Sequence, residues 1–145
     1  MAIKELLIEA QAIQVGVREK DWQKVIEMAA RPLVENGYIL PSYHQAVIAN
    51  TLEHGAYYVF EEGVAMPHAR PECGVLKNCF SLLLLAEPIA FADSDRADIV
   101  IMFAARDSNG HIEEGIRAIV NLLGDDDVMT KLRQAKNKEE AIAIL

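Results

Sequence analysis

The first half of the chain carries a helical pattern of apolar side chains. Between Asp21 and Asn36 they recur at positions i, i+3, i+4, i+7 and i+11, and they are Trp22, Val25, Ile26, Ala29 and Leu33. This spacing places them on one face of a helix that Asp21 can cap and that Asn36-Gly37 ends. The pattern therefore predicts a buried helix, which Pro32 should kink or shorten because proline has no N–H for the helical hydrogen bond.

Four more segments have a helical start signal, a helical apolar spacing or a stop signal. The four segments begin with a proline, a histidine after a turn, an acidic run and an asparagine, respectively. A glycine follows the end of each of the first two segments. These predicted helices run from Pro41 to about Leu52, from His111 to Leu123, from Asp125 through Leu132, and from Asn137 to Leu145.

Four segments read as strands. Residues Ile13–Val17 alternate apolar and small side chains, and Tyr57–Phe60 is aromatic and β-branched. Residues Cys79–Leu85 and Asp98–Ala105 are continuous apolar runs, which are typical of strands covered on both faces. We expect the last two to be the central strands of a sheet.

Helices before, between and after buried strands indicate an α/β fold. A length of 145 residues fits one hydrophobic core. We therefore predict a single three-layer domain over residues 1–145, in which a mixed β-sheet is flanked by helices on both faces. The pattern does not determine the order of the strands.

Charge and composition limit the cellular locations and the classes of partner that we expect for the protein. The chain has 14 Lys and Arg against 22 Asp and Glu, a net charge of −8, which argues against nucleic-acid binding. Charges interrupt Met1–Ala10, so this stretch does not read as a signal peptide, and the longest uncharged apolar run, Cys79–Ala86, is far below the ~20 residues that cross a bilayer. Cys73 and Cys79 have neither redox nor zinc spacing. We expect a cytoplasmic protein without membrane insertion or disulfides.

His68 is the first candidate for chemistry. It follows an apolar strand end and stands between Pro67 and Pro71, which restrict the backbone on either side of it and of Arg70. An imidazole is a good nucleophile near neutral pH when one ring nitrogen is free and the other keeps its proton in a hydrogen bond. The motif thus predicts a residue that accepts and releases a group, although a histidine beside a turn is more often a surface residue.

His111 is the second candidate, because it opens a helix directly after an apolar strand and the turn 106–110. Free N–H groups and the positive end of the helix dipole make such a place attractive to anions. His111 would add a hydrogen-bond donor, so His68 and His111 together would be a nucleophile beside an anion site. A capping role is the simpler alternative for His111.

Two motifs that occur one after the other along the chain resemble those of a known family. The segments Gly63–Glu72 and Ala104–Ile112 are similar to the enzyme IIA domains of the mannitol–fructose superfamily of the bacterial sugar phosphotransferase system (PTS). Within the first segment, Met66–Glu72 looks most like the ascorbate branch. The resemblance runs from about Ile13 to the C-terminus. It implies an enzyme without cofactor or metal, a phosphocarrier between HPr and a cognate enzyme IIB, whose membrane partner IIC moves the sugar.

The resemblance also implies roles for single residues. His68 would take the phosphoryl group, through Nε2, and His111 would hydrogen-bond it. The mannitol branch has an arginine near the end of the helix before the motif, where this chain reads Ala49-Asn50-Thr51. Arg70 could supply the missing positive charge, or it could face solvent or a partner.

Two other functions stay open at this stage. A related phosphoprotein can act in regulation without a transporter, and the histidines could belong to a metal-dependent hydrolase. His111-Ile112-Glu113 resembles part of a deaminase zinc signature, but no Pro-Cys-x-x-Cys follows, so a metal is not expected. His44 and His54 are expected to cap or to face solvent, with His54 near the border of the site. The sugar and the oligomeric state are not determined by the sequence.

Overall fold

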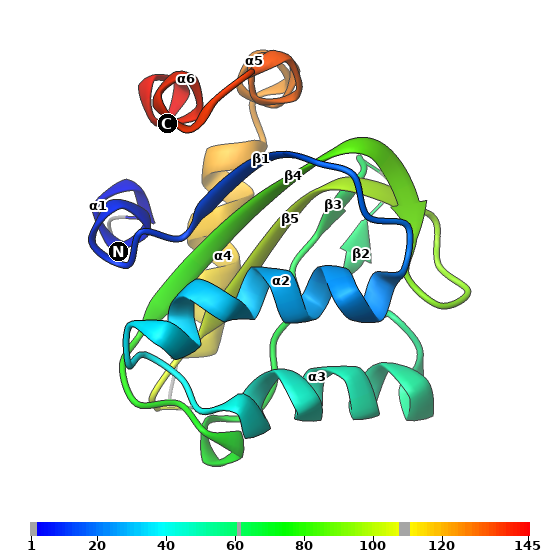
Figure 1. The fold of residues 1–145 in the computed structure, drawn as a ribbon, viewed down its shortest axis with the longest axis vertical. Coiled ribbons are helices and arrows are strands. Elements are labelled where there is room, and N and C mark those ends of the chain that lie inside the picture. The colour runs from blue at the N-terminus through cyan, green and yellow to red at the C-terminus, as the bar shows by residue number, and fades with distance from the viewer. Residues whose placement is uncertain (1–2, 61, 108–110) are drawn as a thin grey trace.

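The computed structural model describes residues 3–60, 62–107 and 111–145, without the side chains of residues 111 and 112. It confirms an α/β fold in which a mixed five-stranded sheet lies between two layers of helices (Figure 1). The helices are α1 (Ile3–Glu9), α2 (Trp22–Glu35), α3 (Pro41–His54), α4 (His111–Leu123), α5 (Asp126–Gln134), α6 (Lys138–Ile144) and the short 3₁₀ helix η1 (Pro71–Cys73). Within the described residues, none of the helices combines the length and apolar content needed to span a bilayer.

The strand order is β1-β4-β5-β3-β2. The strands are β1 (Ile13–Val17), β2 (Val59–Phe60), β3 (Val64–Ala65), β4 (Cys79–Ala90) and β5 (Arg96–Ala104). Strands β4 and β5 are antiparallel and central, as their continuous apolar runs predicted. Strand β1 runs parallel to β4, β3 runs parallel to β5, and β2 closes the other edge antiparallel to β3. The sheet is therefore mixed.

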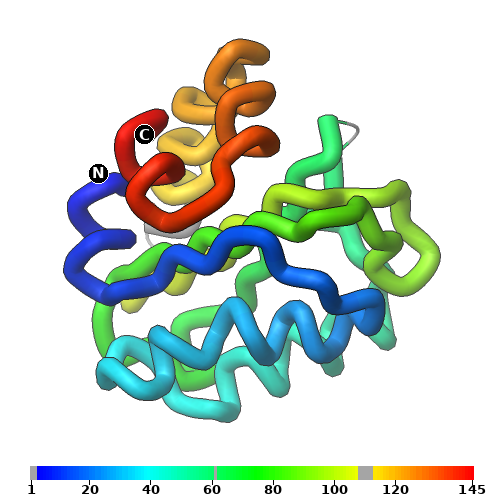
Figure 2. The backbone as a smooth tube through the Cα atoms, turned by 45° about the horizontal axis from the view of Figure 1, so that its top comes forward, coloured from blue at the N-terminus to red at the C-terminus, as the bar shows by residue number. Residues whose placement is uncertain are grey.

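Each face of the sheet has its own apolar core. Helices α2 and α3 cover one face, and α1, α4, α5 and α6 cover the other (Figure 2). Strands β4 and β5 contribute alternate side chains to the two cores, as Leu83 and Val100 do on the α2 face and Leu82 and Ile101 on the α4 face. Because both faces are buried over Cys79–Leu85 and Ile99–Ala104, the side chains of these two segments are apolar except for Ser81.

Several elements differ from the expectation, and β3 and η1 were not among the predicted strands and helices. Helix α1 was not predicted, because a seven-residue helix has little stability alone and depends here on the burial of Ile3 and Leu7 against the sheet. Strand β2 covers only Val59–Phe60, after a turn in which Val59 N–H bonds the Ala56 carbonyl. Strand β4 continues beyond Leu85, because β5 pairs with its far end across an irregularity in the register.

The effect expected of Pro32 on α2 was partly wrong. The helix is not shortened, since it continues from Trp22 to Glu35 with Pro32 inside it. A proline leaves the carbonyl four residues earlier without its helical donor. Gln14 of β1 supplies the missing donor, because its side-chain amide bonds the Met28 carbonyl at 2.7 Å. The sheet thus satisfies the group that the proline leaves unpaired.

Arg133, near the C-terminal end of α5, holds the β2–β3 hairpin that leads into the candidate site. Arg133 Nε donates to both carboxylate oxygens of Asp98 at 3.0 Å, and Arg133 Nη2 donates to the Glu62 carbonyl at 2.6 Å. Gly63, with φ +85°, follows that carbonyl, and a Cβ there would lie 2.7 Å from Arg133 Nη2. Only glycine therefore allows the guanidinium to reach the chain just before β3.

We expect Gly63→Ala to lower the free energy of unfolding more than Gly37→Ala does. Both glycines have φ near +80°, but a Cβ at Gly37 meets nothing within 4 Å. Gly37→Ala should cost about 1 kcal/mol of backbone strain, and Gly63→Ala about 1 kcal/mol more through the displaced Arg133. Urea denaturation measures both costs. In an Arg133→Met background the two substitutions should cost the same, and an excess that persists there would contradict the proposed cause.

Candidate functional site

His68 follows β3 and continues its pairing with β5. The register places His68 opposite Phe103, and the Phe103 N–H donates to the Pro67 carbonyl at 3.3 Å. Met66 is held from the other side, where its N–H donates to the Tyr58 carbonyl at 3.0 Å. The backbone on both sides of the motif is therefore fixed by the sheet, as the proline-bounded sequence suggested.

The imidazole of His68 is half-buried between two aromatic rings. Its ring stacks on Phe103, with centroids 4.7 Å apart and planes at 26°, and the Tyr57 ring stands against it edge-on at 5.8 Å. Stacking on one face and an edge contact leave little freedom for the imidazole to rotate. Its reactive atoms therefore point in a reproducible direction.

A hydrogen bond determines which ring nitrogen carries the proton. His68 Nδ1 lies 2.8 Å from the Met66 carbonyl oxygen. A carbonyl only accepts hydrogen bonds, so Nδ1 must be the donor, and the lone pair of the neutral ring lies on Nε2. Burial lowers the pKa of His68 below its usual value, and the bond to Met66 opposes this effect only in part. A neutral, Nε2-nucleophilic histidine is the result.

Helix α4 approaches this ring pair closely. A Cβ at Gly115 would lie 2.9 Å from the Phe103 ring, so glycine is required where the helix packs on that ring. The N-terminal end of α4 therefore lies next to the aromatic ring on which His68 stacks, as the placement of His111 at the helix start predicted. The side chain of His111 lies outside the described residues, so its position relative to His68 stays a prediction.

Arg70 follows on an extended backbone, with φ −72° and ψ 150°. Ala69, between His68 and Arg70, faces the core under α3. The Arg70 side chain is exposed, and within the described residues it makes no hydrogen bond or ion pair. It is free to meet a phosphoryl group or a partner.

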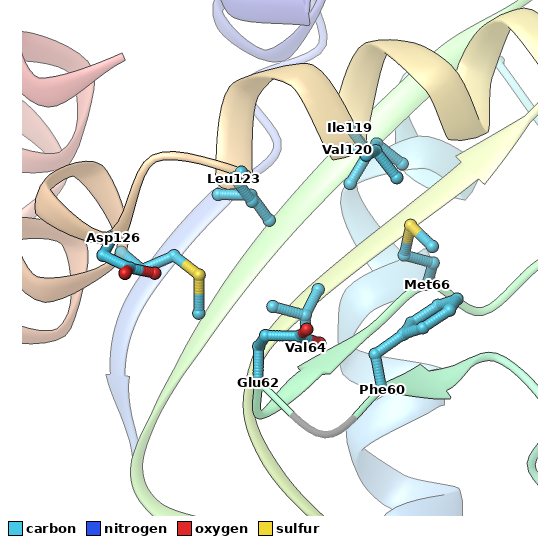
Figure 3. Close-up of a pocket in the computed structure, with 10 residues that line it drawn as sticks. Phe60, Glu62, Val64, Met66, Ile119, Val120, Leu123 and Asp126 are labelled. Atoms are coloured by element: carbon cyan, nitrogen blue, oxygen red, sulfur yellow. The ribbon is translucent and has the colours of Figure 1, made fainter.

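An apolar cavity of about 380 Å³ begins beside the motif, since Met66 lines it (Figure 3). Phe60 and Met66 from the sheet edge face Ile119 and Val120 of α4 across this space. Glu62 and Asp126 add carboxylates at its border. The candidate site thus consists of a rigid nucleophile and an apolar groove that starts next to it.

Comparison with known proteins identifies the family. Residues 6–145 match the family model described as "Phosphoenolpyruvate-dependent sugar phosphotransferase system, EIIA 2". The chain belongs to this family. The ascorbate-specific PTS system EIIA component of Escherichia coli (strain K12) is 36% identical over 147 residues, which cover 100% of this chain and 96% of that protein.

Solved structures agree with the assignment. A PTS IIA protein (PtxA) from Streptococcus mutans has a TM-score of 0.92 and 35% identity, over 99% of this chain and 92% of its own. The enzyme IIA of the mannitol system of Escherichia coli, solved in complex with phosphorylated enzyme IIB, has a TM-score of 0.79 and 28% identity, over 93% and 94% of the two chains. This chain is thus a phosphotransferase component that carries a phosphoryl group from HPr to an enzyme IIB in sugar uptake.

The other two described histidines of this enzyme IIA belong to α3. His44 is half-buried with its Nδ1 unpaired in the described structure, and burial lowers its pKa while Glu27 opposes the shift. His54 is exposed at the end of α3, 3.8 Å from the Glu53 carboxylate. Among the described residues, neither stacks on the His68 ring or hydrogen-bonds to it.

The possible metal ligands and the two thiols were located in the described part of this enzyme IIA. No three His, Cys, Asp or Glu side chains there are grouped to hold a metal ion. Cys73 and Cys79 are free cysteines, and burial raises the pKa of the Cys79 thiol to about 12. The Cys79 thiol is therefore protonated and inert near neutral pH.

Sequence reasoning missed the residues that hold the imidazole. Phe103 and Tyr57 were read only as strand residues, and Gly115 as an unremarked position inside a helix. The parallel pairing of β3 with β5 brings Phe103 opposite His68. The sequence does not give the order of the strands, so it could not place Phe103 beside His68. A glycine within an otherwise apolar helical stripe was the one signal that could have indicated close packing at α4.

We expect NMR titration of this enzyme IIA to give a His68 pKa below its value in the urea-unfolded chain, about 6.5. Between the two values the unfolded state binds more protons, so the free energy of unfolding should fall as the pH is lowered through this window. His68→Gln should remove that part of the pH dependence and leave the part from His44. Nitrogen-15 shifts should show a protonated Nδ1. A protonated Nε2 in the neutral ring, or a raised pKa, would contradict the geometry.

Proposed function

We propose that His68 is the phosphoryl acceptor of this enzyme IIA and that Nε2 is the bonding atom. The hydrogen bond from His68 Nδ1–H to the Met66 carbonyl is the observation that carries the proposal. It keeps the proton on the inner nitrogen and leaves the other lone pair free. The lowered pKa of His68 keeps this lone pair unprotonated near neutral pH.

The proposed transfer consists of two nucleophilic displacements at phosphorus. The Nε2 lone pair attacks phosphorus, the new N–P bond forms, and the bond from phosphorus to the donor nitrogen of HPr breaks with its electron pair returning to HPr. The imidazole gains positive character, which strengthens the Nδ1–H bond to the Met66 carbonyl. In the second step the cysteine sulfur of enzyme IIB attacks the same phosphorus, and the N–P electrons return to Nε2. Positioning and charge stabilisation carry most of such a reaction.

His111 and Arg70 are proposed to stabilise the transferring group. The start of α4 beside Phe103 offers the positive end of a helix dipole to the phosphoryl oxygens. His111, the first residue of this helix, would donate a hydrogen bond there. Arg70, exposed and two residues after His68, would supply the positive charge that is missing at Asn50.

Both partners are proposed to dock over the same face, in turn. A single Nε2 serves donor and acceptor, so HPr and enzyme IIB must each bring their reactive atom in line with it. The rim of this face carries apolar side chains that are 42% to 56% exposed, which are Tyr57, Phe60 and Val120. Two of them also line the cavity shown in Figure 3. Such exposed apolar groups are typical of protein docking sites.

Membership of the family supports proposals for the location and for the sugar. We infer a cytoplasmic protein, because a carrier between HPr and a IIB domain must meet both of them there. The 36% identity to a component named ascorbate-specific favours an ascorbate-type sugar acid. The carrier itself contacts only protein partners and a phosphoryl group, so this inference rests on lineage.

We expect enzyme I, HPr and phosphoenolpyruvate to add one phosphoryl group to the wild-type protein, measured as intact mass. His68→Ala should gain none, because the nucleophile is absent. His54→Ala is the matched control, since this histidine is exposed at the end of α3, and it should be labelled like the wild type. Labelling of the His68→Ala protein would refute the assignment.

The rate of onward transfer to a cognate enzyme IIB should test the proposed roles of His111 and Arg70. His111→Ala should still accept phosphate but transfer it about 10- to 1000-fold more slowly, as expected for one lost transition-state hydrogen bond. Arg70→Ala should slow transfer or raise the KM for a partner, and Arg18→Ala, exposed after β1, is its control. Rates equal to the wild type would remove the residue from the site. Labelling by HPr without transfer to any IIB would instead favour a regulatory phosphoprotein.

A further inference from the structure

The pairing of β3 with β5 is interrupted by a side chain at His68. In a parallel pair, the residue opposite His68 should donate its N–H to residue 67 and accept a hydrogen bond from the N–H of residue 69. The first bond exists, from Phe103 N–H to the Pro67 carbonyl. The second is replaced: the Ala69 N–H donates to the Tyr43 hydroxyl at 2.9 Å, and that hydroxyl donates to the Phe103 carbonyl at 2.7 Å.

We propose that Tyr43 is a positioning residue for phosphoryl transfer, because its hydroxyl is inserted between the two strands at the acceptor histidine. The proposal rests on the proposed role of His68. The hydroxyl bridges the peptide after His68 to the carbonyl of the residue whose ring lies under the imidazole. It therefore sets the separation of the two backbones where the two rings stack, and with it the direction of Nε2.

The surroundings of the hydroxyl suit this role. Tyr43 is fully buried on α3, with no exposed side-chain area, and burial raises its pKa well above the usual value, so the hydroxyl keeps its proton. The Ala69 carbonyl also lies 3.3 Å from the hydroxyl oxygen, but the one proton is best used by the shorter contact to Phe103. A protonated hydroxyl that accepts one bond and donates another has a single orientation.

The simpler alternative is that Tyr43 only fills the core under α3. In that case loss of its hydroxyl would lower the free energy of unfolding and would not change the rate of phosphoryl transfer. Tyr58 provides the matched comparison, because its hydroxyl is also buried and hydrogen-bonded, to Thr51 Oγ1 at 2.8 Å. That bond joins α3 to the turn before β2 and makes no contact with the peptides around His68. Each Tyr→Phe change removes one oxygen and keeps the ring.

The test is steady-state transfer from phospho-HPr to the protein and on to enzyme IIB, with Tyr43→Phe and Tyr58→Phe compared at equal folded fraction. Tyr43→Phe should lower kcat about 10- to 100-fold, since small misplacement of a reacting atom has effects of this size. The KM for phospho-HPr should not change, because the docking face is untouched. Nitrogen-15 and proton shifts of the His68 imidazole should move in Tyr43→Phe only.

Two results would overturn the proposal. One is a Tyr43→Phe protein that keeps the wild-type kcat and His68 shifts while it loses as much stability as Tyr58→Phe. The other comes from the wild type and needs no variant: an Ala69 amide that exchanges with solvent as fast as an exposed amide shows that the inserted hydroxyl bond is absent. The proposed function fails separately, through labelling of His68→Ala.

Discussion

The chemistry proposed for this enzyme IIA depends on the hydrogen bond from His68 Nδ1–H to the Met66 carbonyl. Burial between Phe103 and Tyr57 alone would lower the pKa of the ring but would leave either nitrogen free to carry the proton. The carbonyl two residues earlier selects Nδ1 and exposes the lone pair of Nε2 to a partner. Its own position is fixed because the Met66 N–H is bonded to the strand edge at Tyr58.

The bond in turn depends on a very short strand. β3 has only two residues, and contacts from four directions hold it: β5 on one side, β2 on the other, Arg133 of α5 at its start and Tyr43 of α3 at its end. The contacts from β5, Arg133 and Tyr43 come from segments distant in sequence, while β2 is joined to β3 by a short turn. The histidine is rigid because the chain around it is bonded to both helical layers, so a two-residue strand followed by a proline-bounded motif is held without long pairing.

This arrangement explains which parts of the structure could be predicted from the sequence and which could not. The long helices and the two central strands are predictable because each carries a repeated apolar spacing and a cap or stop residue, as at Asp21 and Asn137, whose side chains accept the expected backbone bonds. The continuity of α2 past Pro32 depends on Gln14 from another element, and α1 depends on burial of Ile3 and Leu7. The nucleophile His68 is predictable from its motif. Phe103 and Tyr43 are not, because only the strand order and the placement of α3 bring them to it.

A phosphocarrier must bind its group firmly enough to accept it and loosely enough to release it. A phosphoryl group buried between Phe103 and Tyr57 would lose hydration that these two aromatic rings cannot replace. On the proposed acceptor atom Nε2, the group would instead lie on the side of the imidazole opposite the Met66 carbonyl. In the proposed site the positive end of α4 and Arg70 would offset part of its charge, and on a chain of net charge −8 the remaining charge would favour release. Precise positioning of the nitrogen, rather than tight binding of the phosphate, is then the main contribution of the fold to transfer.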